Sequence, residues 1–335
     1  MATIKDVARR AGVAISTVSA VLNRSAPVSE QVIGKVDKAI AAVGYVPHGA
    51  ARSLRSGNSQ LIGLVVPNIA NPHFAAVARE IENICLTAGY MTVVYSTGQD
   101  PERESQVLKM LRVQRVAGLI IIPTRSDAEH GSHLVDKIRV PTVMLDMFVE
   151  GLPYDVIKTD NIEAGRLAAG HLLGIGHRRI GIIIGIAGLA TSDDRLAGYL
   201  KAHAEHGVAV EPGLQLAGNF DQRQAYQRTI EVLQRADRPT ALMAISNMMT
   251  LGLLFAVREL KLRIPADLSI VGIDDLEFAA VINPPPTVVV TPILAMARRS
   301  IEVLLGQINH KKAATGAWEI HQPHLLIRES TRAMS

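Results

Sequence analysis

Polar side chains recur just after the short apolar runs of residues 61–290. Asp and Asn exchange hydrogen bonds with hydroxyl groups, Arg binds carboxylates or hydroxyls, and Phe offers an apolar ring face. Taken singly, each such residue is typical of a helix cap or a turn. Their recurrence at six predicted strand ends indicates a site for a small polar molecule. The groups are Asn68, Asn71, His73 and Phe74; Asp146; Asp193, Asp194 and Arg195; Asn219 and Phe220; Ser246 and Asn247; Asp274 and Asp275.

A second set of residues, near the N-terminus, fits DNA. Thr3 and Asp6 form a capping-box pattern before a predicted first helix, and Gly12 ends it. A second helix is predicted over 15–22, with Val18, Val21 and Leu22 facing inward and Ser16, Ser19, Ala20 and Asn23 facing outward. Two short helices around a glycine-containing turn form a helix-turn-helix, whose second helix enters the major groove. An ordinary helical hairpin would show the same local pattern.

Charge separates the first 60 residues from the rest. They hold eight Lys and Arg residues, among them Lys5 and Arg24, against three acidic residues. The other 275 residues hold 27 basic and 28 acidic residues, so the body is nearly neutral. A basic head is typical of a nucleic-acid-binding domain, whereas a merely solvated face would not predict this segregation.

A short segment, residues 47–58, follows a third helix predicted from Ser29 to Gly44. It has room for two helical turns at most, and an isolated helix of that length is unstable in water. A linker that folds on binding DNA would place Arg52 and Arg55 against phosphates and Leu54 as a wedge in the minor groove. A flexible tether is the alternative.

From residue 61 onward, apolar runs alternate with helical patterns in two successive series, which predicts two α/β lobes with parallel sheets. We therefore expect an all-α head followed by an α/β body, with a ligand between the lobes at the carboxyl ends of the strands. The strands are predicted at 61–66, 91–95, 118–122, 141–145, 180–184, 214–218, 240–245, 268–273 and 287–290. The helices between them are predicted near 73–88, 101–113, 131–138, 161–174, 192–206, 221–235, 247–260 and 293–308.

Composition argues against other classes of protein. No apolar run approaches the 18 residues of a membrane span, and residues 1–6 lack a signal-peptide core, so we expect a cytoplasmic protein without membrane contact. The single cysteine, Cys85, is predicted to be buried. His203 and His206 are predicted to lie on a solvated helix face rather than to bind metal. Motifs for a P-loop, a zinc protease or a serine hydrolase are absent, so we expect no enzyme activity, catalytic residue, metal or cofactor.

Together these motifs resemble the lactose-repressor (LacI/GalR) family of transcriptional regulators along essentially the whole chain. The motifs that carry the resemblance are Thr3-Ile4-Lys5-Asp6-Val7-Ala8, Ala11-Gly12-Val13, Thr17-Val18-Ser19, Gly44-Tyr45-Val46-Pro47, Ala51-Arg52-Ser53-Leu54-Arg55, Ile62-Gly63-Leu64-Val65, Arg195-Leu196-Ala197-Gly198 and Val271-Gly272-Ile273-Asp274-Asp275. The resemblance implies a homodimeric regulator, expected to be a repressor, that binds a pseudo-palindromic operator in double-stranded DNA. A small effector, a sugar or a sugar acid, would bind between two lobes of the periplasmic-binding-protein type.

The resemblance also implies boundaries and contacts. A helix-turn-helix domain would span 1–46, a hinge helix and linker 47–60, and an effector-binding domain 61–332. Within that domain, lobe one would comprise 61–160 and 291–318, and lobe two 161–290 and 319–332. The implied DNA contacts are Thr3, Lys5, Ile15, Ser16, Thr17, Ser19, Ala20, Asn23, Arg24, Arg52, Leu54 and Arg55. The implied effector contacts are Asn71, His73, Phe74, Asp146, Arg195, Phe220, Asn247, Asp274 and Thr291.

Several positions depart from the family pattern. Ile15, Ser16 and Ala20 occupy base-reading positions, and none of them is a bidentate reader of guanine, so Ile15 and Ala20 would touch thymine methyl groups instead. His73 stands where an aromatic ring is frequent, which favours an acidic sugar if the imidazole is charged and makes no such distinction if it is neutral. A sugar-binding module without DNA and an enzyme with a dinucleotide site remain the alternatives, and the basic head opposes both.

Overall fold

The computed structural model describes residues 2–23, 26–45, 59–135, 137–310 and 313–334. The chain forms two compact units, a head over Met1–Ser59 and a body over Gln60–Ser335. Among the described helices, none is both long enough and apolar enough to cross a membrane.

Three helices build the head: α1 (Ile4–Ala11), α2 (Ile15–Asn23) and α3 (Glu30–Val43). The backbone N–H and the hydroxyl of Thr3 donate to Asp6 Oδ2 at 2.9 and 2.7 Å, which completes the predicted capping box. Gly12 ends α1 at a φ of +67°, a left-handed conformation that glycine adopts without steric cost. The start and the end predicted for the first helix are therefore confirmed.

Five side chains form the core of the head, and they come from all three helices: Val7, Ala8, Val18, Val36 and Ala39. Val21 and Leu22, which the sequence places inward, are half-buried and pack against this core. Ser29 precedes α3 as predicted, but its hydroxyl makes no capping hydrogen bond.

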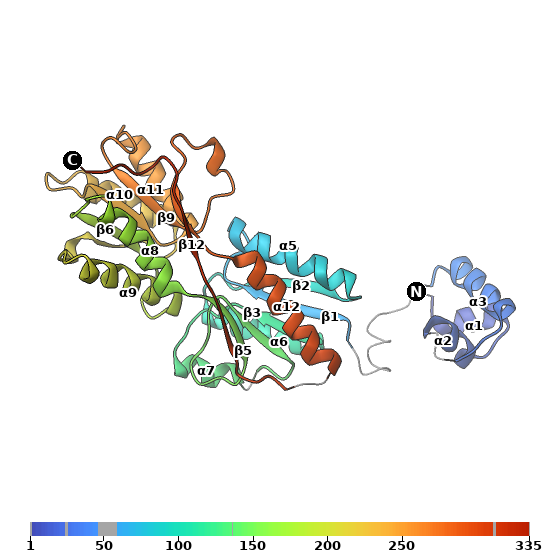
Figure 1. The fold of residues 1–335 in the computed structure, drawn as a ribbon. Helices are drawn as coiled ribbons and strands as arrows, with labels where there is room; N and C mark the ends of the chain where they lie inside the picture. The colour runs from blue at the N-terminus through green and yellow to red at the C-terminus, as the bar shows by residue number, and fades with distance from the viewer. Residues whose placement is uncertain (1, 24–25, 46–58, 136, 311–312, 335) are drawn as a thin grey trace. The chain divides into compact units, whose positions relative to one another are not determined.

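The first lobe of the body contains a fully parallel sheet in the order β11-β5-β4-β3-β1-β2 (Figure 1). Helices α5 and α12 share a buried core on one face of this sheet, and α6 and α7 share a second core on the other face. The strands are β1 (Leu61–Val66), β2 (Met91–Ser96), β3 (Gly118–Ile121), β4 (Thr142–Leu145), β5 (Asp155–Thr159) and β11 (Trp318–His321). The helices are α5 (Pro72–Thr87), α6 (Pro101–Val113), α7 (Ala128–Val135) and α12 (Ile293–His310).

The second lobe repeats this plan with a sheet in the order β12-β10-β9-β8-β6-β7, in which β12 alone is antiparallel to its neighbour. The two predicted α/β series are thus confirmed. The strands are β6 (Ile180–Ile184), β7 (Gln215–Ala217), β8 (Ala241–Ala244), β9 (Ser269–Ile273), β10 (Thr287–Val290) and β12 (His324–Leu326). The helices are α8 (Asn161–Gly174), α9 (Ala190–Glu205), α10 (Gln222–Leu233) and α11 (Asn247–Glu259), with 3₁₀ turns η1 (Pro212–Leu214) and η2 (Ala279–Val281).

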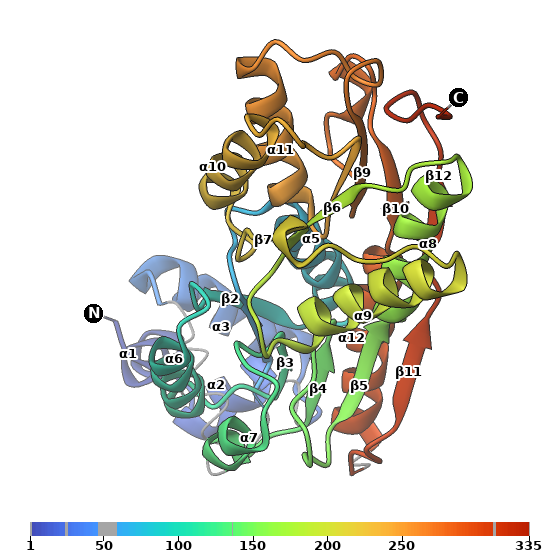
Figure 2. The same ribbon diagram turned by 90° about the vertical axis from the view of Figure 1, so that its left-hand side faces the viewer.

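The chain passes between the lobes three times: after β5, after β10 and after β11. Figure 2 shows the third of these segments, where β11 lies beside β5. The boundary expected at residue 318 falls three residues too early, because Glu319, Ile320 and His321 still pair with β5. Pro323, which has no N–H to donate, comes only after that pairing ends.

An aromatic and charged cluster lies where β5 leaves the first sheet. The Lys158 ammonium is 4.7 Å from the ring centroid of Phe148 and 5.5 Å from that of Trp318. The two rings are themselves 4.4 Å apart, centroid to centroid. Lys158 Nζ also lies 3.1 Å from Oδ2 of Asp194, on α9. Because α9 belongs to the second lobe, this buried lysine joins the two lobes.

Cys85 is buried, as predicted, in the core shared by α5 and α12. The prediction that His203 lies on a solvated face is wrong, since its side chain is 1% exposed. Its ring lies 4.1 Å from that of Tyr199, whose hydroxyl donates to the carbonyl of Ile180. This turn of α9 therefore faces the second sheet. Which side of α9 faces the sheet depends on the packing of the helix and cannot be read from its local sequence.

Candidate functional site

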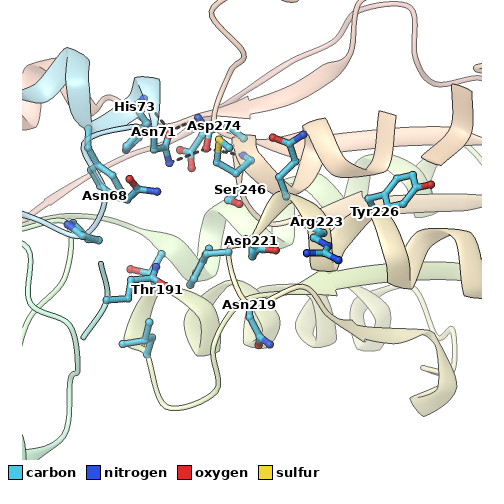
Figure 3. A pocket seen from close by; sticks show the side chains of 18 of the residues that line it. Asn68, Asn71, His73, Thr191, Asn219, Asp221, Arg223, Tyr226, Ser246 and Asp274 are labelled. Atoms are coloured by element: carbon cyan, nitrogen blue, oxygen red, sulfur yellow. Dashed lines mark hydrogen bonds between the residues drawn. The ribbon is translucent and has the colours of Figure 1, made fainter. Parts of the chain in front are cut away.

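A cavity of about 1180 Å³ lies between the two lobes. In each sheet the strand order reverses direction, between β1 and β3 in the first and between β6 and β8 in the second. Ligands of open α/β sheets bind at the carboxyl ends of strands beside such a reversal. The lining residues come from the segments that follow β1, β2 and β4 in one lobe and β6, β7, β8 and β9 in the other (Figure 3).

The structure brings together most of the residues that the sequence singles out. Eight of the nine expected effector contacts line the cavity: Asn71, His73, Phe74, Asp146, Arg195, Phe220, Asn247 and Asp274. Asn68, Asn219 and Ser246 also line it, whereas Asp193, Asp194 and Asp275 do not. Thr291 is not among the lining residues either; its hydroxyl instead donates to Asp274 Oδ1 at 2.5 Å. In this structure Thr291 therefore supports Asp274 from behind.

Arg195 is the central cation of the cavity and is only 3% exposed. Its Nε donates to Asn161 Oδ1 at 2.9 Å, and its Nη1 donates to the Ile245 carbonyl at 2.5 Å and to Asp274 Oδ2 at 3.1 Å. These bonds fix the guanidinium plane, because Arg donors have a rigid fork geometry. No bond to Nη2 occurs within the part of the chain that the structure describes, so this nitrogen is the donor available to a ligand.

The close approach of α8 and α9 makes this position of Arg195 possible. A Cβ on Gly165 would lie 2.0 Å from the Arg195 carbonyl, and a Cβ on Gly198 would lie 2.0 Å from the Ile162 carbonyl. Only glycine fits at such contacts. The two glycines thus let Arg195, on α9, reach Asn161 at the start of α8.

Two carboxylates flank Arg195 in opposite electrostatic situations. Burial disfavours ionisation of Asp274, but the Arg195 guanidinium, His73 and the hydrogen bonds from Thr291 and Arg195 outweigh it, so the pKa of Asp274 is lowered. Burial raises the pKa of Asp146, and the attraction of Arg195 does not offset it. The Asp146 carboxylate accepts no hydrogen bond from any residue that the structure describes. Asp146 and Asp274 also share a left-handed backbone, at φ of +64° and +65°.

An amide pair connects the lobes across the cavity. Asn247 Nδ2 donates to Asn71 Oδ1 at 2.8 Å, and Asn71 Nδ2 donates to Asn247 Oδ1 at 3.3 Å. Asn71 Oδ1 also accepts the His73 backbone N–H at the start of α5. Phe220, held at a φ of +55°, packs against the hydrophobic cores of both lobes. These contacts bridge the two lobes beside a partly apolar chamber with amide, carboxylate and guanidinium groups on its walls.

Some residues that line the cavity were not among those predicted from the sequence. Thr191 is 5% exposed, lines the cavity, and has a buried hydroxyl oxygen without a hydrogen-bond partner in the described chain. Such a group is typically satisfied by ligand or water. Thr191 lies in the first turn of α9, the helix that follows β6, and this position in the sequence would have predicted that it lines the cavity. The lining also includes residues that lie within α10, within α11 or just after α11, and so do not directly follow a strand. Their positions at the cavity are not predictable from the pattern of polar residues at strand ends. They are Arg223, Tyr226, Phe255, Arg258, Glu259 and Lys261.

The expected DNA contacts divide into three groups. Thr3, Lys5, Ile15 and Ser16 are exposed, with Ile15 43% exposed at the start of α2. Thr17, Ser19 and Ala20 are half-buried. The side chain of Asn23 and the residues Arg24, Arg52, Leu54 and Arg55 lie outside the described residues. Hydrogen bonds from the side chain and backbone of Thr3 lower the pKa of Asp6, so this carboxylate is ionised at the start of α1.

Among the described residues, no three His, Cys, Asp or Glu side chains gather as potential metal ligands.

The chain matches known protein families in its N-terminal and its C-terminal parts. Residues 3–48 match the bacterial regulatory proteins of the lacI family, and residues 169–331 match the periplasmic binding protein-like domain.

Relatives match along the whole chain. The HTH-type transcriptional repressor PurR of Photobacterium profundum is 32% identical over 335 residues, covering 100% of both chains. The crystal structure of the lac repressor dimer bound to operator and the anti-inducer ONPF is 28% identical, with a TM-score of 0.85 and 99% of each chain covered. The transcriptional regulator CelR in complex with cellobiose is 29% identical, with a TM-score of 0.72, covering 98% of this chain and 100% of that one.

Proposed function

The chain belongs to the LacI family of transcriptional repressors. We propose that its affinity for an operator is controlled by a sugar-type effector that binds between the two lobes of its body. The observation that carries this proposal is the combination in one chain of an exposed helix-turn-helix surface and a chamber lined by polar groups from seven strand ends. Under this proposal the chain performs no catalytic step.

A sugar is the proposed effector because the chamber offers the groups that recognise hydroxyls. Asp146, Asn247 and the Nη2 of Arg195 provide acceptors and donors, and Phe74 and Phe220 provide apolar faces for the ring carbons. The cellobiose complex of CelR supports this choice, since that relative binds a sugar. We therefore assign the protein to the control of carbohydrate metabolism.

The head is proposed to read DNA over residues 1–46, with the hinge over 47–60 and the effector domain over 61–332. Ile15, at the start of α2, is proposed to contact thymine methyl groups, and Lys5 a phosphate. Arg52, Leu54 and Arg55 are proposed to act in the minor groove. Because such a protein works on the chromosome, we propose a cytoplasmic location.

A homodimer is proposed because apolar side chains gather on one edge of the first lobe. Leu86 at the end of α5 is 72% exposed, and Met91 at the start of the edge strand β2 is 70% exposed. Exposed apolar groups beside an unpaired strand edge favour association. The lac repressor relative is a dimer on its operator. Two identical heads would require a pseudo-palindromic site.

The mechanism that we propose couples effector to DNA through lobe closure. An effector that binds the closed chamber better than the open one shifts the balance between the two lobe arrangements. That shift would alter the paired hinge segments and so the affinity for the operator. This mechanism is compatible with an effector that releases the protein from DNA and with one that strengthens its binding to DNA.

The test is selection of binding sites from random duplex DNA with the full-length protein, followed by gel shifts with the selected fragment. We expect a two-fold symmetric site, and a Leu54→Ala variant should bind it more weakly. Recovery of an asymmetric site would contradict the dimer, and failure to enrich any site would contradict the repressor assignment. Thermal shifts with glucose, ribose and cellobiose then test for the effector, because a ligand of the native state raises the melting temperature.

A further inference from the structure

The first turn of α9 is held by the first lobe, although α9 belongs to the second. Leu189, which precedes the helix, is 3% exposed and lies in the buried core shared by α5 and α12. The Ala190 N–H donates to the hydroxyl of Ser126, which follows β3, at 3.2 Å. Further along the helix, Asp194 Oδ2 accepts a hydrogen bond from Lys158 on β5 at 3.1 Å. These contacts dock the start of α9 on the other lobe.

The same turn of α9 carries two residues that line the chamber, Thr191 and Arg195. Residues four positions apart share a face of a helix, so Ala190 and Asp194 form one face, and Thr191 and Arg195 form the neighbouring face. The first face meets the first lobe, and the second face meets the chamber. A displacement of this turn from the first lobe therefore also displaces the groups that would meet an effector.

Lys158 belongs to the first lobe and takes its ion-pair partner from the second. Its side chain is 10% exposed, and its ammonium lies over the rings of Phe148 and Trp318, both of the first lobe. Among the described residues its ion-pair partner is Asp194, whose side chain is 28% exposed. A buried cation that loses its partner is left uncompensated, whereas water stabilises a partly exposed carboxylate. Withdrawal of α9 from β5 is therefore opposed mainly by the burial of Lys158.

We propose that Lys158 and Asp194 form a latch between the lobes, which holds the first turn of α9 on the first lobe and so sets the affinity of the effector-free protein for its operator. The second half of this inference rests on the proposed function, because that function couples the lobe arrangement to DNA binding. Neither residue lines the chamber, so both are positioning residues that act through α9 and not by contact with an effector.

Hydrogen–deuterium exchange of the full-length protein, without DNA or sugar, tests the latch itself. Asp194→Asn removes the charge and keeps the side-chain shape. We expect amide exchange over residues 186–196 to become at least about threefold faster, because local opening exposes these N–H groups. Lys158→Met should have the same effect, since methionine keeps an unbranched apolar chain beside the two rings. Unchanged exchange in α11 shows that each variant is folded.

Asp193→Asn is the matched control. Asp193 lies in the first turn of α9, is exposed and does not line the chamber. It accepts the Gly188 N–H at 3.1 Å within its own lobe, a bond that asparagine can keep. The substitution removes the same charge from the positive end of the helix as Asp194→Asn does. A difference between the two variants therefore reports the ion pair and not the helix dipole.

Gel shifts with the selected operator fragment test the consequence for DNA. Lys158→Met and Asp194→Asn should each change operator affinity at least about threefold, toward weaker binding if the docked arrangement binds DNA and toward tighter binding if it releases DNA. The double variant should change it no more than the larger single effect, because both substitutions remove one shared interaction. Asp193→Asn should stay within about twofold of the wild type.

The outcomes separate this inference from the proposed function. Exchange over 186–196 that stays unchanged in both latch variants, or that Asp193→Asn raises equally, overturns the latch while the repressor assignment stands. Faster exchange with unchanged operator affinity overturns its control of DNA binding, and additive effects of the two substitutions overturn the pair. Failure of the wild type to select any DNA site overturns the proposed function, and the exchange data still decide the latch. Faster exchange with a non-additive change in operator affinity supports the whole inference.

Discussion

At the scale of single residues, the chamber depends on one guanidinium that is fixed from three sides. Arg195 is bound by Asn161, by the Ile245 carbonyl and by Asp274, three partners from three segments of the second lobe. Loss of one partner from a buried pair leaves the other charge uncompensated. A substitution at Asp274 is therefore expected to alter the affinity of any ligand that contacts Arg195.

Asp274→Asn is expected to weaken effector binding by about 10- to 100-fold, because it removes a charge-assisted bond while keeping the side-chain shape. Operator affinity without effector should remain within about twofold, because Asp274 belongs to the body and not to the head. Calorimetry with the sugar that gives the largest thermal shift measures the first quantity, and gel shifts measure the second. If effector affinity and operator affinity decreased equally, Asp274 would be shown to stabilise the fold rather than to support ligand binding.

At the scale of elements, the sequence predicts most of the body well. Its buried strands are continuous apolar runs, such as β3 and β8, and such runs are typical of parallel sheets covered on both faces. The polar residues that follow them gather in one chamber because the sheet order puts those strand ends together.

Strands β5 and β11 are not predictable from the local sequence, and the physical reason is the same for both. Strand β5 contains Asp155 and Lys158, and β11 alternates exposed and half-buried residues, so neither shows a long apolar run. The pairing of Arg195 with Asn161 spans 34 positions along the chain and depends on the packing of α8 against α9. Thr191 was missed for a similar reason, since only the folded chamber shows that its hydroxyl lacks a partner.

Gly198→Ala tests the contact between α8 and α9. The added methyl group would lie 2.0 Å from the Ile162 carbonyl and 2.7 Å from the Arg166 backbone nitrogen, so the helices must separate. We expect a loss of about 1–3 kcal/mol in the free energy of unfolding, measured with urea, together with weaker effector binding.

Gly170→Ala on the same helix pair is the control. Its Cβ would meet nothing within 4 Å, so alanine should stabilise α8 by about 0.5–1 kcal/mol. Equal effects of the two substitutions would show that close helix approach does not limit this site.

At the scale of the whole molecule, stability of the second lobe is linked to pH. Burial lowers the pKa of His171, His177 and His203 below the ordinary value of 6.5. The unfolded chain therefore binds more protons than the folded chain once the pH falls below about 6.5. Stability is full above that pH and decreases as the pH falls toward the lowered values.

We expect the melting temperature of the full-length protein to fall between pH 7.5 and pH 5 by more than in a His171→Gln variant, whose amide can still bond Thr331. His324→Gln is the control, because His324 is exposed on β12. Scanning calorimetry in buffers of equal ionic strength makes the comparison. A parallel fall in all three proteins would remove His171 from the pH response.

The proposed dimer is a second property of the whole molecule. Replacement of both Leu86 and Met91 by Glu should yield a monomer in light scattering and reduce operator affinity at least about tenfold, because charges would replace apolar contacts. Val113→Glu is the control, since Val113 is 83% exposed on α6, which packs on the other face of the sheet. A double variant that stays dimeric would place the interface elsewhere.

The cluster around Lys158 has a practical consequence. Trp318 is the single tryptophan of the chain, and its ring lies beside Phe148 and the ammonium that reaches across to Asp194. The tryptophan emission of the protein, excited selectively over that of its tyrosines, thus originates from one position, where the connecting strands leave the first lobe. Any rearrangement that moves Asp194 changes the field and the quenching at that indole. Titration of the unlabelled protein can therefore follow lobe movement by fluorescence, and a stopped-flow trace of the same signal would time it.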